Sequence, residues 1–345
     1  MTIRAERPSR GTRPSRPGAA RPAFVLVLAL ALLAASLLAS IALGNLAIPA
    51  DAVLDVLAGH GDPHHTAVIQ SRYPRTALGV LAGACLAVAG TLMQGVTRNP
   101  LADPGMLGIN AGASATIVAA TAYLGASGQN AALWWALPGA LLAGLVVHLV
   151  GTRHGGTSTV RLVLAGAVLS AVLNAFIQAV TLSKPQVFDS YRYWVVGSLA
   201  GRDFDVLWTV LPPAAAGLIV ALALGGPLNT LALGDDSATA LGARPARTKA
   251  AGLLTATVLA AAATAAVGPI AFVGLAVPHV VRALVGTDFR LQLLLSLLLG
   301  PALLLAADVI GRLVLRPEEL MVGVVTAFVG APALLLAVRR MRRNA

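Results

Sequence analysis

Long apolar segments recur along the whole sequence, and the stretches between them are too short to form a separate soluble domain. A bilayer core about 30 Å thick needs roughly 20 apolar residues per helix. Segments of this kind lie near residues 23–44, 73–96, 105–124, 131–150, 162–182, 206–225, 250–267, 270–285, 291–313 and 320–338. Of all residues, 57% are hydrophobic and only 11% are charged. The sequence therefore predicts an all-α integral membrane protein with about ten transmembrane helices.

Positive charges predict how these helices are oriented, because short cytoplasmic loops are enriched in Lys and Arg. An even number of helices places both arginine-rich termini on the same side, together with most of the 25 basic residues. On the other side lie Arg72, Arg75, Lys184, Arg192, Arg202, Arg312 and Arg316. We therefore expect both termini to be cytoplasmic. The net charge of +11 then reflects orientation and contact with anionic lipid headgroups, and no nucleic-acid partner is expected.

The domain organisation follows from the same pattern. Residues 1–22 place arginines among prolines and serines, and the apolar run that follows is too long for a cleaved signal peptide. We expect them to form a disordered, basic cytoplasmic tail. Residues 23–343 are expected to form one transmembrane domain, with a cytoplasmic coupling loop near 227–249. The single cysteine, Cys85, excludes an intramolecular disulfide.

One polar, helix-breaking stretch interrupts the apolar pattern: QGVTRNPLADPGMLGINAGAS, residues 94–114. Asn99-Pro100 and Asp103-Pro104 favour turn or extended backbone before each proline. Hydrocarbon cannot satisfy the unpaired backbone groups of such a segment, whereas surrounding protein or a water-filled cavity can. Two interpretations remain open: this stretch forms a pore wall or gate, or it is an ordinary tight loop.

Six strings of the sequence carry a resemblance to a known family. They are RYPRTALGVLAGACLAVAGTLMQGVTRNPLADPGMLGINAGAS (72–114), RLVLAGAVLS (161–170), YWVVGSLAG (193–201), LGDDSATALGA (233–243), GPIAFVGLAVPHVVR (268–282) and ELMVGVVTAFVGAPALLL (319–336). Together these strings resemble the FecCD-type permeases, which are membrane subunits of ABC importers for ferric siderophores, haem and vitamin B12. The resemblance covers nearly the whole chain after the tail and follows the order of the family.

The resemblance implies a type II ABC importer permease in a bacterial cell membrane. Such a permease pairs with a second one, identical or similar, and works with two cytoplasmic ATPase subunits and an extracytoplasmic substrate-binding protein. It imports a metal chelate of the iron-siderophore type by alternating access. The chain would be a transport subunit and not an enzyme, with no bound cofactor and with ATP used by the ATPase. The sequence agrees on one point, since it contains no G-x-x-x-x-G-K-[ST] phosphate loop.

Three arginines are candidates for docking the binding protein. The resemblance implies that Arg72, Arg75 and Arg312 face acidic residues of that protein, where charge complementarity sets register and on-rate. The alternative is that these arginines only snorkel to the membrane interface. Asp308 lies four residues before Arg312, which is an ion-pair spacing on a helix and favours a structural pair.

A short cytoplasmic helix is predicted for residues 234–242, with Asp235 as its N-cap and Gly242 closing it in left-handed geometry. The matching element of the family sits in a groove of the ATPase and transmits its movement. The residues assigned to coupling on this basis are Asp235, Asp236, Ala238, Leu241 and Gly242. A solvated loop helix without this role is the alternative.

The resemblance also places cytoplasmic gates. They match Asn99, Pro100 and Leu101 in one loop and Ser158 and Thr159 in another. The residue after Thr159 is a valine, where some relatives have a small polar residue, so the second gate departs from the pattern. Asn99 has an alternative role as a helix cap.

Two other classes of function were weighed. An ion-gradient-driven secondary transporter of a small metabolite typically needs carboxylates near the membrane midplane, and here only Asp308 falls inside a span. A membrane-embedded enzyme needs a constellation of polar residues at one depth, and the sequence shows none. His60, His64 and His65 are predicted to be solvated loop residues, so no metal site is expected.

Overall fold

The computed structural model describes residues 20–152 and 159–343, which are helical except for short turns, and none of these residues lies in a strand. The prediction of an all-α membrane protein is confirmed. Most of the predicted basic tail lies outside the described ranges. The helices are α1 (Ala20–Ala42), α2 (Ala50–Leu57), α3 (Pro63–Thr97), η1 (Pro104–Leu107), α4 (Ile109–Leu124), α5 (Gln129–Thr152), α6 (Thr159–Ser183), α7 (Pro185–Val195), α8 (Phe204–Ala223), α9 (Gly225–Leu231), α10 (Asp235–Ala240), α11 (Pro245–Val267), α12 (Val273–Val285), α13 (Phe289–Val314) and α14 (Val322–Arg343).

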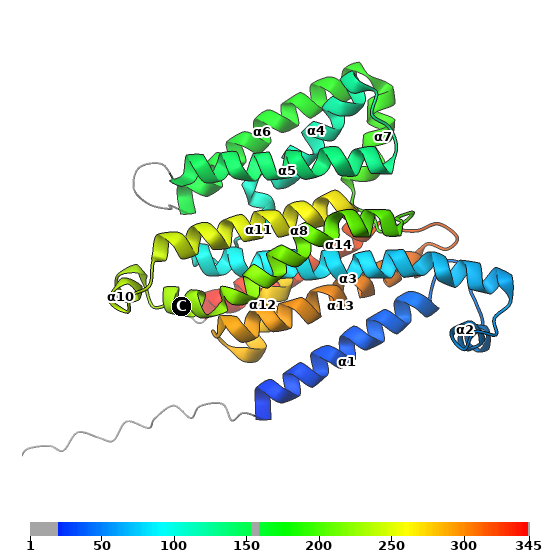
Figure 1. Cartoon of the computed structure of the whole chain (residues 1–345), viewed down its shortest axis with the longest axis horizontal. Helices are drawn as coiled ribbons and strands as arrows, with labels where there is room; N and C mark the ends of the chain where they lie inside the picture. Colours follow the sequence, from blue (N-terminus) through cyan, green and yellow to red (C-terminus); the bar gives the residue numbers. More distant parts are fainter. Residues whose placement is uncertain (1–19, 153–158, 344–345) are drawn as a thin grey trace, which may run out of the picture.

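Every predicted apolar segment coincides with one of these helices. Among the described residues, 7 helices are long and apolar enough to cross a membrane: α1, α3, α5, α6, α8, α11 and α13. The apolar parts of α4, α12 and α14 are shorter. The end of the chain and α10 lie at one end of the molecule, while α2 and α7 lie at the opposite end (Figure 1). The position of both termini on one side of the membrane and the number of membrane crossings stay predictions.

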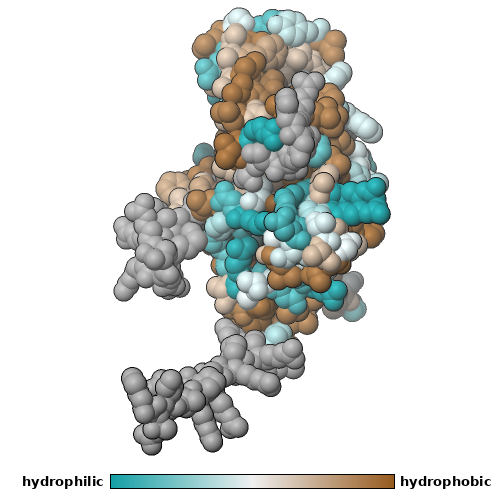
Figure 2. Space-filling model, turned by 90° about the vertical axis from the view of Figure 1, so that its left-hand side faces the viewer, coloured by the Kyte–Doolittle hydropathy of each residue, from teal (hydrophilic) through white to brown (hydrophobic). Residues whose placement is uncertain are grey.

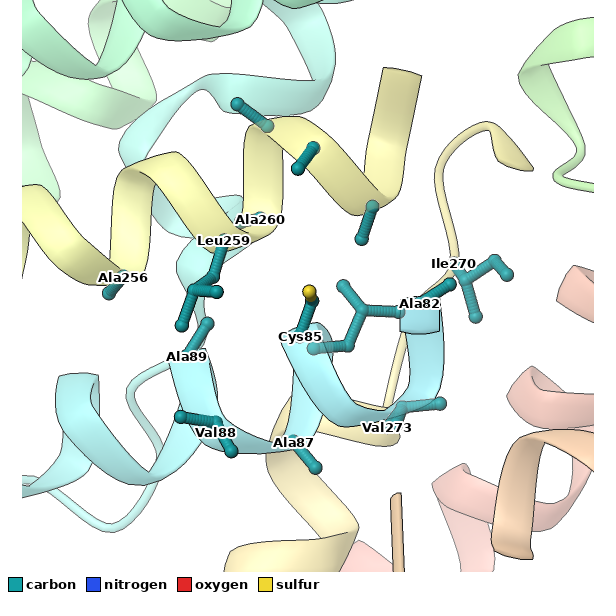
Figure 3. Packing of buried hydrophobic residues seen from close by; sticks show 14 of the residues in the cluster. Ala82, Cys85, Ala87, Val88, Ala89, Ala256, Leu259, Ala260, Ile270 and Val273 are labelled. Atoms are coloured by element: carbon teal, nitrogen blue, oxygen red, sulfur yellow. The ribbon is translucent and has the colours of Figure 1, made fainter. Parts of the chain in front are cut away.

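Helix α3 runs through the middle of the larger of two layers and packs against α8, α11, α12 and α13. Small residues make this close packing possible. A Cβ atom added to Gly83 would lie 2.7 Å from the carbonyl oxygen of Gly300 in α13, and one added to Gly90 only 1.9 Å from that of Gly274 in α12. Between them, Cys85 points towards α11 (Figure 3). Glycines therefore set the distance between α3 and its neighbours.

The second layer consists of α4, α5, α6 and α7, which lie together on the far side of α11 (Figure 1). It has a small apolar core of its own, formed by Ala115, Val118, Ile177, Val180 and Val187. Helix α5 joins this layer to α11. Helix α6 leaves most of its apolar side chains exposed, so much of its surface is free to meet lipid or another subunit.

Local capping explains where several helices begin, and it accounts for the differences from the predicted boundaries. Asp62 accepts a hydrogen bond from the backbone N–H of His64, 3.0 Å away, and Pro63 opens α3. The helix thus starts before residue 73, because its first turns are polar and hydropathy does not detect them. Helix α12 has only 13 residues. Helices α2, α7 and α9 were not predicted.

Candidate transport and coupling sites

A cluster of buried charges lies at the end of the molecule opposite α10. Asp308 of α13 is 1% exposed and pairs with two arginines. The guanidinium of Arg75 donates to both carboxylate oxygens, at 3.1 Å from Nε and 2.8 Å from Nη2. Arg312 binds the same carboxylate across one turn of α13, so the predicted ion pair is present. Arg75 also reaches Glu319 at 2.8 Å.

Backbone carbonyls at the end of α1 complete this cluster. Arg72 donates to the carbonyl oxygens of Ile41, Ala42 and Leu46 at 2.8, 2.9 and 3.0 Å. Arg312 donates to the carbonyl oxygen of Ser40 at 2.9 Å and to its hydroxyl at 2.8 Å. The last carbonyls of a helix have no partner within the helix, so these arginines cap α1 and tie it to α3 and α13.

The structure thus brings together the three arginines predicted for docking, Arg72, Arg75 and Arg312, beside one cavity of about 380 Å³ that Glu319 also lines. Their donors are used largely by their own chain. Because Glu319 is more exposed than Asp308, the ion pair between Arg75 and Glu319 is the one that a carboxylate from outside can reach. The docking role itself stays a prediction. Sequence reasoning missed Ser40 and Glu319, because Ser40 lies far in the chain from its partner Arg312, and Glu319 lies far from its partner Arg75.

The bend after α3 folds back into the protein. A Cβ atom added to Gly274 would lie 3.0 Å from the carbonyl oxygen of Leu86 and 3.1 Å from Oδ2 of Asp103. Leu86 lies about three turns before the end of α3, so Asp103 reaches well inside the bundle. Its Oδ1 accepts a hydrogen bond from the N–H of Gly105 at 2.7 Å and caps η1. Surrounding protein therefore shelters this irregular backbone, as a segment at membrane depth requires.

The predicted gate residues begin this bend. Arg98 ends α3 in left-handed geometry, with a φ of 51°. The side chain of Asn99 accepts a hydrogen bond from the N–H of Leu101 at 3.0 Å, so it stabilises the turn. Leu101 is exposed. For the second gate, Ser158 lies outside the described residues, and Thr159 is the first residue of α6. The gating roles stay predictions.

The predicted coupling helix is present as α10. Gly242 has a φ of +79° and follows the helix as predicted. The prediction that Asp235 is the N-cap is wrong: Gly234 holds that position, and Asp235 is the first helical residue. Its carboxylate instead points to partners on other helices. Ala238 is fully buried, whereas Asp236 and Leu241 are exposed.

Asp235 links α10 to two other helices. Its carboxylate forms ion pairs with Arg98 at the end of α3 and with Lys249 of α11. Arg98 also donates to the carbonyl oxygen of Leu231 in α9 at 2.6 Å. The hydrogen bond from Lys249, helped by Arg98, holds the pKa of Asp235 below its usual value. The predicted coupling helix is therefore tied to the residue that precedes the predicted gate.

This end of the molecule also differs in its surface. Hydrophilic residues gather in the middle of the end face that carries α10, and hydrophobic residues flank them (Figure 2). Among the residues the structure describes, no group of three or more His, Cys, Asp or Glu side chains is arranged to hold a metal ion. His64 and His65 belong to the first turn of α3.

The chain is similar to known membrane transport proteins along nearly its whole length. Residues 32–340 match the model of the FecCD transport family. The chain is 50% identical over 307 residues to the ferric enterobactin transport system permease protein FepD of Escherichia coli, a match that covers 88% of this chain and 92% of that protein. It is 37% identical to the probable siderophore transport system permease protein YfiZ of Bacillus subtilis, covering 81% and 85%.

A solved structure has the same fold. The chain superimposes with a TM-score of 0.81 on a chain of a metal-chelate type ABC transporter in an inward-facing conformation. The two sequences are 26% identical, and the match covers 92% of this chain and 99% of that one. The arrangement of short and long helices described above is therefore shared with a transporter of this type.

Proposed function

Because the chain belongs to the FecCD transport family, as a permease subunit of an ABC importer in a bacterial inner membrane, we propose that its cargo is a ferric siderophore. The observation that carries this proposal is the 50% identity to a ferric enterobactin permease over nearly the full length of both chains. A subunit of this kind does not hydrolyse ATP itself. Energy comes from a separate ATPase subunit.

Transport by this chain proceeds by alternating access, with α10 as the element that receives the movement of the ATPase. Exposed Leu233 and Leu241 flank α10 and suit a groove on a partner protein, because burying their side chains there removes apolar surface from water. The ion pair between Asp235 and Arg98 provides a direct mechanical connection from α10 to Asn99, Pro100 and Leu101.

At the opposite end, the binding protein docks next to Arg72, Arg75 and Arg312. The physical support is the exposure of Glu319, whose pair with Arg75 an incoming carboxylate can replace without leaving a buried charge unpaired. Asp308 keeps Arg75 and Arg312 oriented while this exchange takes place.

The full importer contains a second permease subunit, two ATPase subunits and one extracytoplasmic binding protein. The exposed apolar surface of α6 is a suitable contact for the second permease, and the other exposed apolar helices, among them α1, face lipid. Helix α10 and its surroundings form the surface for the ATPase.

Reconstituted uptake tests this function. The chain is reconstituted with a second permease, an ATPase and a binding protein of this family in proteoliposomes loaded with ATP. We expect uptake of ⁵⁵Fe bound to enterobactin, no such uptake when the ATPase is left out, and no uptake of ⁵⁷Co-labelled vitamin B12. Uptake by the chain alone under an imposed proton or sodium gradient would instead support a secondary transporter.

A further inference from the structure

Arg202 is a buried cation without a counter-ion. It lies in the turn between α7 and α8 and is 8% exposed. Its Nε has no hydrogen-bond acceptor among the described residues. Burial lowers the pKa of Arg202, and no carboxylate in the described part of the chain offsets this effect. The neighbouring Asp203 is exposed and forms no ion pair with it. Since arginine stays protonated in proteins, the charge remains.

Such a group is unusual, because burying a charge is costly unless it is paired or hydrogen-bonded. The other buried arginines at this end of the molecule all have acceptors: Arg72 binds three carbonyl groups, and Arg75 and Arg312 share Asp308. The Nε of Arg312 also has no acceptor, but its other nitrogens bind Asp308 and Ser40. Arg202 differs from these three arginines because its side chain has no ion pair or hydrogen bond within the described residues. Arg202 is buried although its Nε has no acceptor within the described residues. We take this as an indication that a ligand supplies the acceptor.

A second unpaired donor lies beside it. Arg202 and Trp194 both line a cavity of about 460 Å³ between α4, α5, α7 and the start of α14, which is within the usual size range of small-molecule sites. Trp194 is 6% exposed, and its indole Nε1 has no acceptor in the described structure. Tyr193 and Ser198 add hydroxyl groups to the wall. The cavity is therefore lined by two residues that carry unpaired donors, one of which is positively charged.

The backbone that carries these two side chains is held rigidly. The N–H of Ser198 donates to the carbonyl of Val267 at 2.8 Å, and that of Gly323 to the carbonyl of Gly197 at 3.2 Å. Gly197 has a φ of +77° and lies against the carbonyl oxygen of Pro269, where an added Cβ would be 2.3 Å away. Hydrogen-bond donors that are held in place by the surrounding backbone need little reorganisation when they bind a ligand.

The position of the cavity connects it with transport. Arg202 also lines the cavity that contains Arg72, Arg75, Arg312 and Glu319. Arg202 thus lies between the two cavities, at the end of the molecule where the binding protein is proposed to deliver its cargo.

We propose that Arg202 and Trp194 bind an oxyanion group of the transported ferric chelate, such as a carboxylate or catecholate oxygen. A guanidinium offers a planar pair of N–H donors to such a group, and the indole N–H adds a third. A phospholipid phosphate carries the same chemistry, so the test separates the two sources. The inference deepens the proposed function, because it assumes an anionic cargo.

Binding to the purified importer in nanodiscs of zwitterionic lipid provides the test. The probes are the ferric complex of 2,3-dihydroxybenzoate, which is anionic, and the neutral ferric complex of acetohydroxamate, each labelled with ⁵⁵Fe and measured by equilibrium dialysis. Loss of a charge-assisted hydrogen bond weakens binding by about tenfold or more. We expect Arg202→Gln to raise the Kd of the anionic probe by about that factor and Trp194→Phe to raise it less. The neutral probe is unaffected.

Two comparisons make the result specific to this site. Arg247→Gln is the matched control, because Arg247 is an exposed arginine at the start of α11 that lines neither cavity, and its loss leaves the Kd unchanged. In the absence of ligand, Arg202→Gln removes an unpaired buried charge, so its melting temperature is equal to or above that of the wild type. A purely structural arginine would give a lower one.

A second arm uses nanodiscs that contain anionic phospholipid. If Arg202→Gln loses bound phospholipid and keeps its affinity for the chelate, the oxyanion site exists and its ligand is the lipid phosphate, which overturns the assignment to cargo. Equal Kd values for wild type and Arg202→Gln, with equal lipid content, overturn the site altogether. Transport of a siderophore that nevertheless requires the ATPase would leave the proposed function intact in both cases.

Discussion

At the scale of single residues, the described part of the chain contains buried charges that have charged or carbonyl partners and one, Arg202, for which no such partner is found there. Asp308 neutralises Arg75 and orients Arg312, and the end of α1 supplies carbonyl groups to Arg72 and Arg312. The carboxylate of Asp308, which lies inside an apolar helix, is thus engaged in structural ion pairs. It is therefore unavailable as the coupling carboxylate of a secondary transporter.

The substitution Asp308→Asn tests whether Asp308 has this structural role. The substitution removes the negative charge shared by Arg75 and Arg312, and breaking a buried ion pair from one side costs about 3–5 kcal/mol. We expect a clear fall in the melting temperature of the purified permease. Glu319→Gln serves as the control, since Glu319 is more exposed and binds only Arg75, and its effect is smaller. Equal stability of Asp308→Asn and wild type would contradict the structural role.

The ion pairs of Asp235 predict a pH dependence. Because its pKa is lowered in the folded protein, their contribution is complete above the ordinary pKa of aspartate and is lost as the pH falls through the lowered value. We expect hydrogen-exchange protection of α10, corrected for the intrinsic rate, to fall only in that acidic range. Asp235→Asn abolishes the transition, and Asp236→Asn, which has no ion pair in the described structure, retains it.

At the scale of helices, small residues decide how closely α3 approaches its neighbours. Helices α3 and α12 cross with their backbones in contact at Gly90 and Gly274. Gly274 also lies against the side chain of Asp103, in the bend that follows α3. The packing of α3 against α12 and the position of the predicted gate are therefore linked.

Gly90→Ala should therefore disturb this crossing. Its new methyl group meets backbone, which cannot move aside as a side chain can, and overpacking typically costs about 1–3 kcal/mol or more. The matched control is Gly252→Ala in α11, where the nearest atom is the flexible Cγ2 of Val96 at 2.5 Å. We expect lower yield and melting temperature for Gly90→Ala than for Gly252→Ala. The reverse order would show that the crossing is looser than described.

At the scale of the whole molecule, the two ends have different tasks. One end carries α10 and its ion pairs, and the other carries the arginine cluster and both cavities that Arg202 lines. Helix α3, which joins Arg75 near one end to Arg98 at the other, is the element through which both ends are connected.

The two ends should also lie on opposite sides of the membrane. We expect a membrane-impermeant maleimide to label Asp51→Cys of α2 in intact spheroplasts and Asp236→Cys of α10 only after permeabilisation, because the basic residues around α10 favour the cytoplasm. The native Cys85 is buried and provides a low background. Labelling of both variants from the same side would refute the ten-helix topology.

The sequence by itself determined the class of the protein, the positions of its apolar helices and the family to which it belongs. Hydropathy reports the cost of placing residues in a bilayer, and that cost depends on local composition. The pairing of Asp308 with Arg312 and the left-handed Gly242 were also predictable, because both depend on neighbours within a few residues.

Only the tertiary structure decided which distant groups meet. Asp235 was expected to cap its own helix, yet it binds Arg98 and Lys249 on other helices. Arg202 was counted as one of several positive charges, and only the folded structure shows that it is buried without an acceptor for its Nε among the described residues. Partners separated by a hundred or more residues are set by the three-dimensional packing of helices, and burial then fixes how strongly each charge needs a partner.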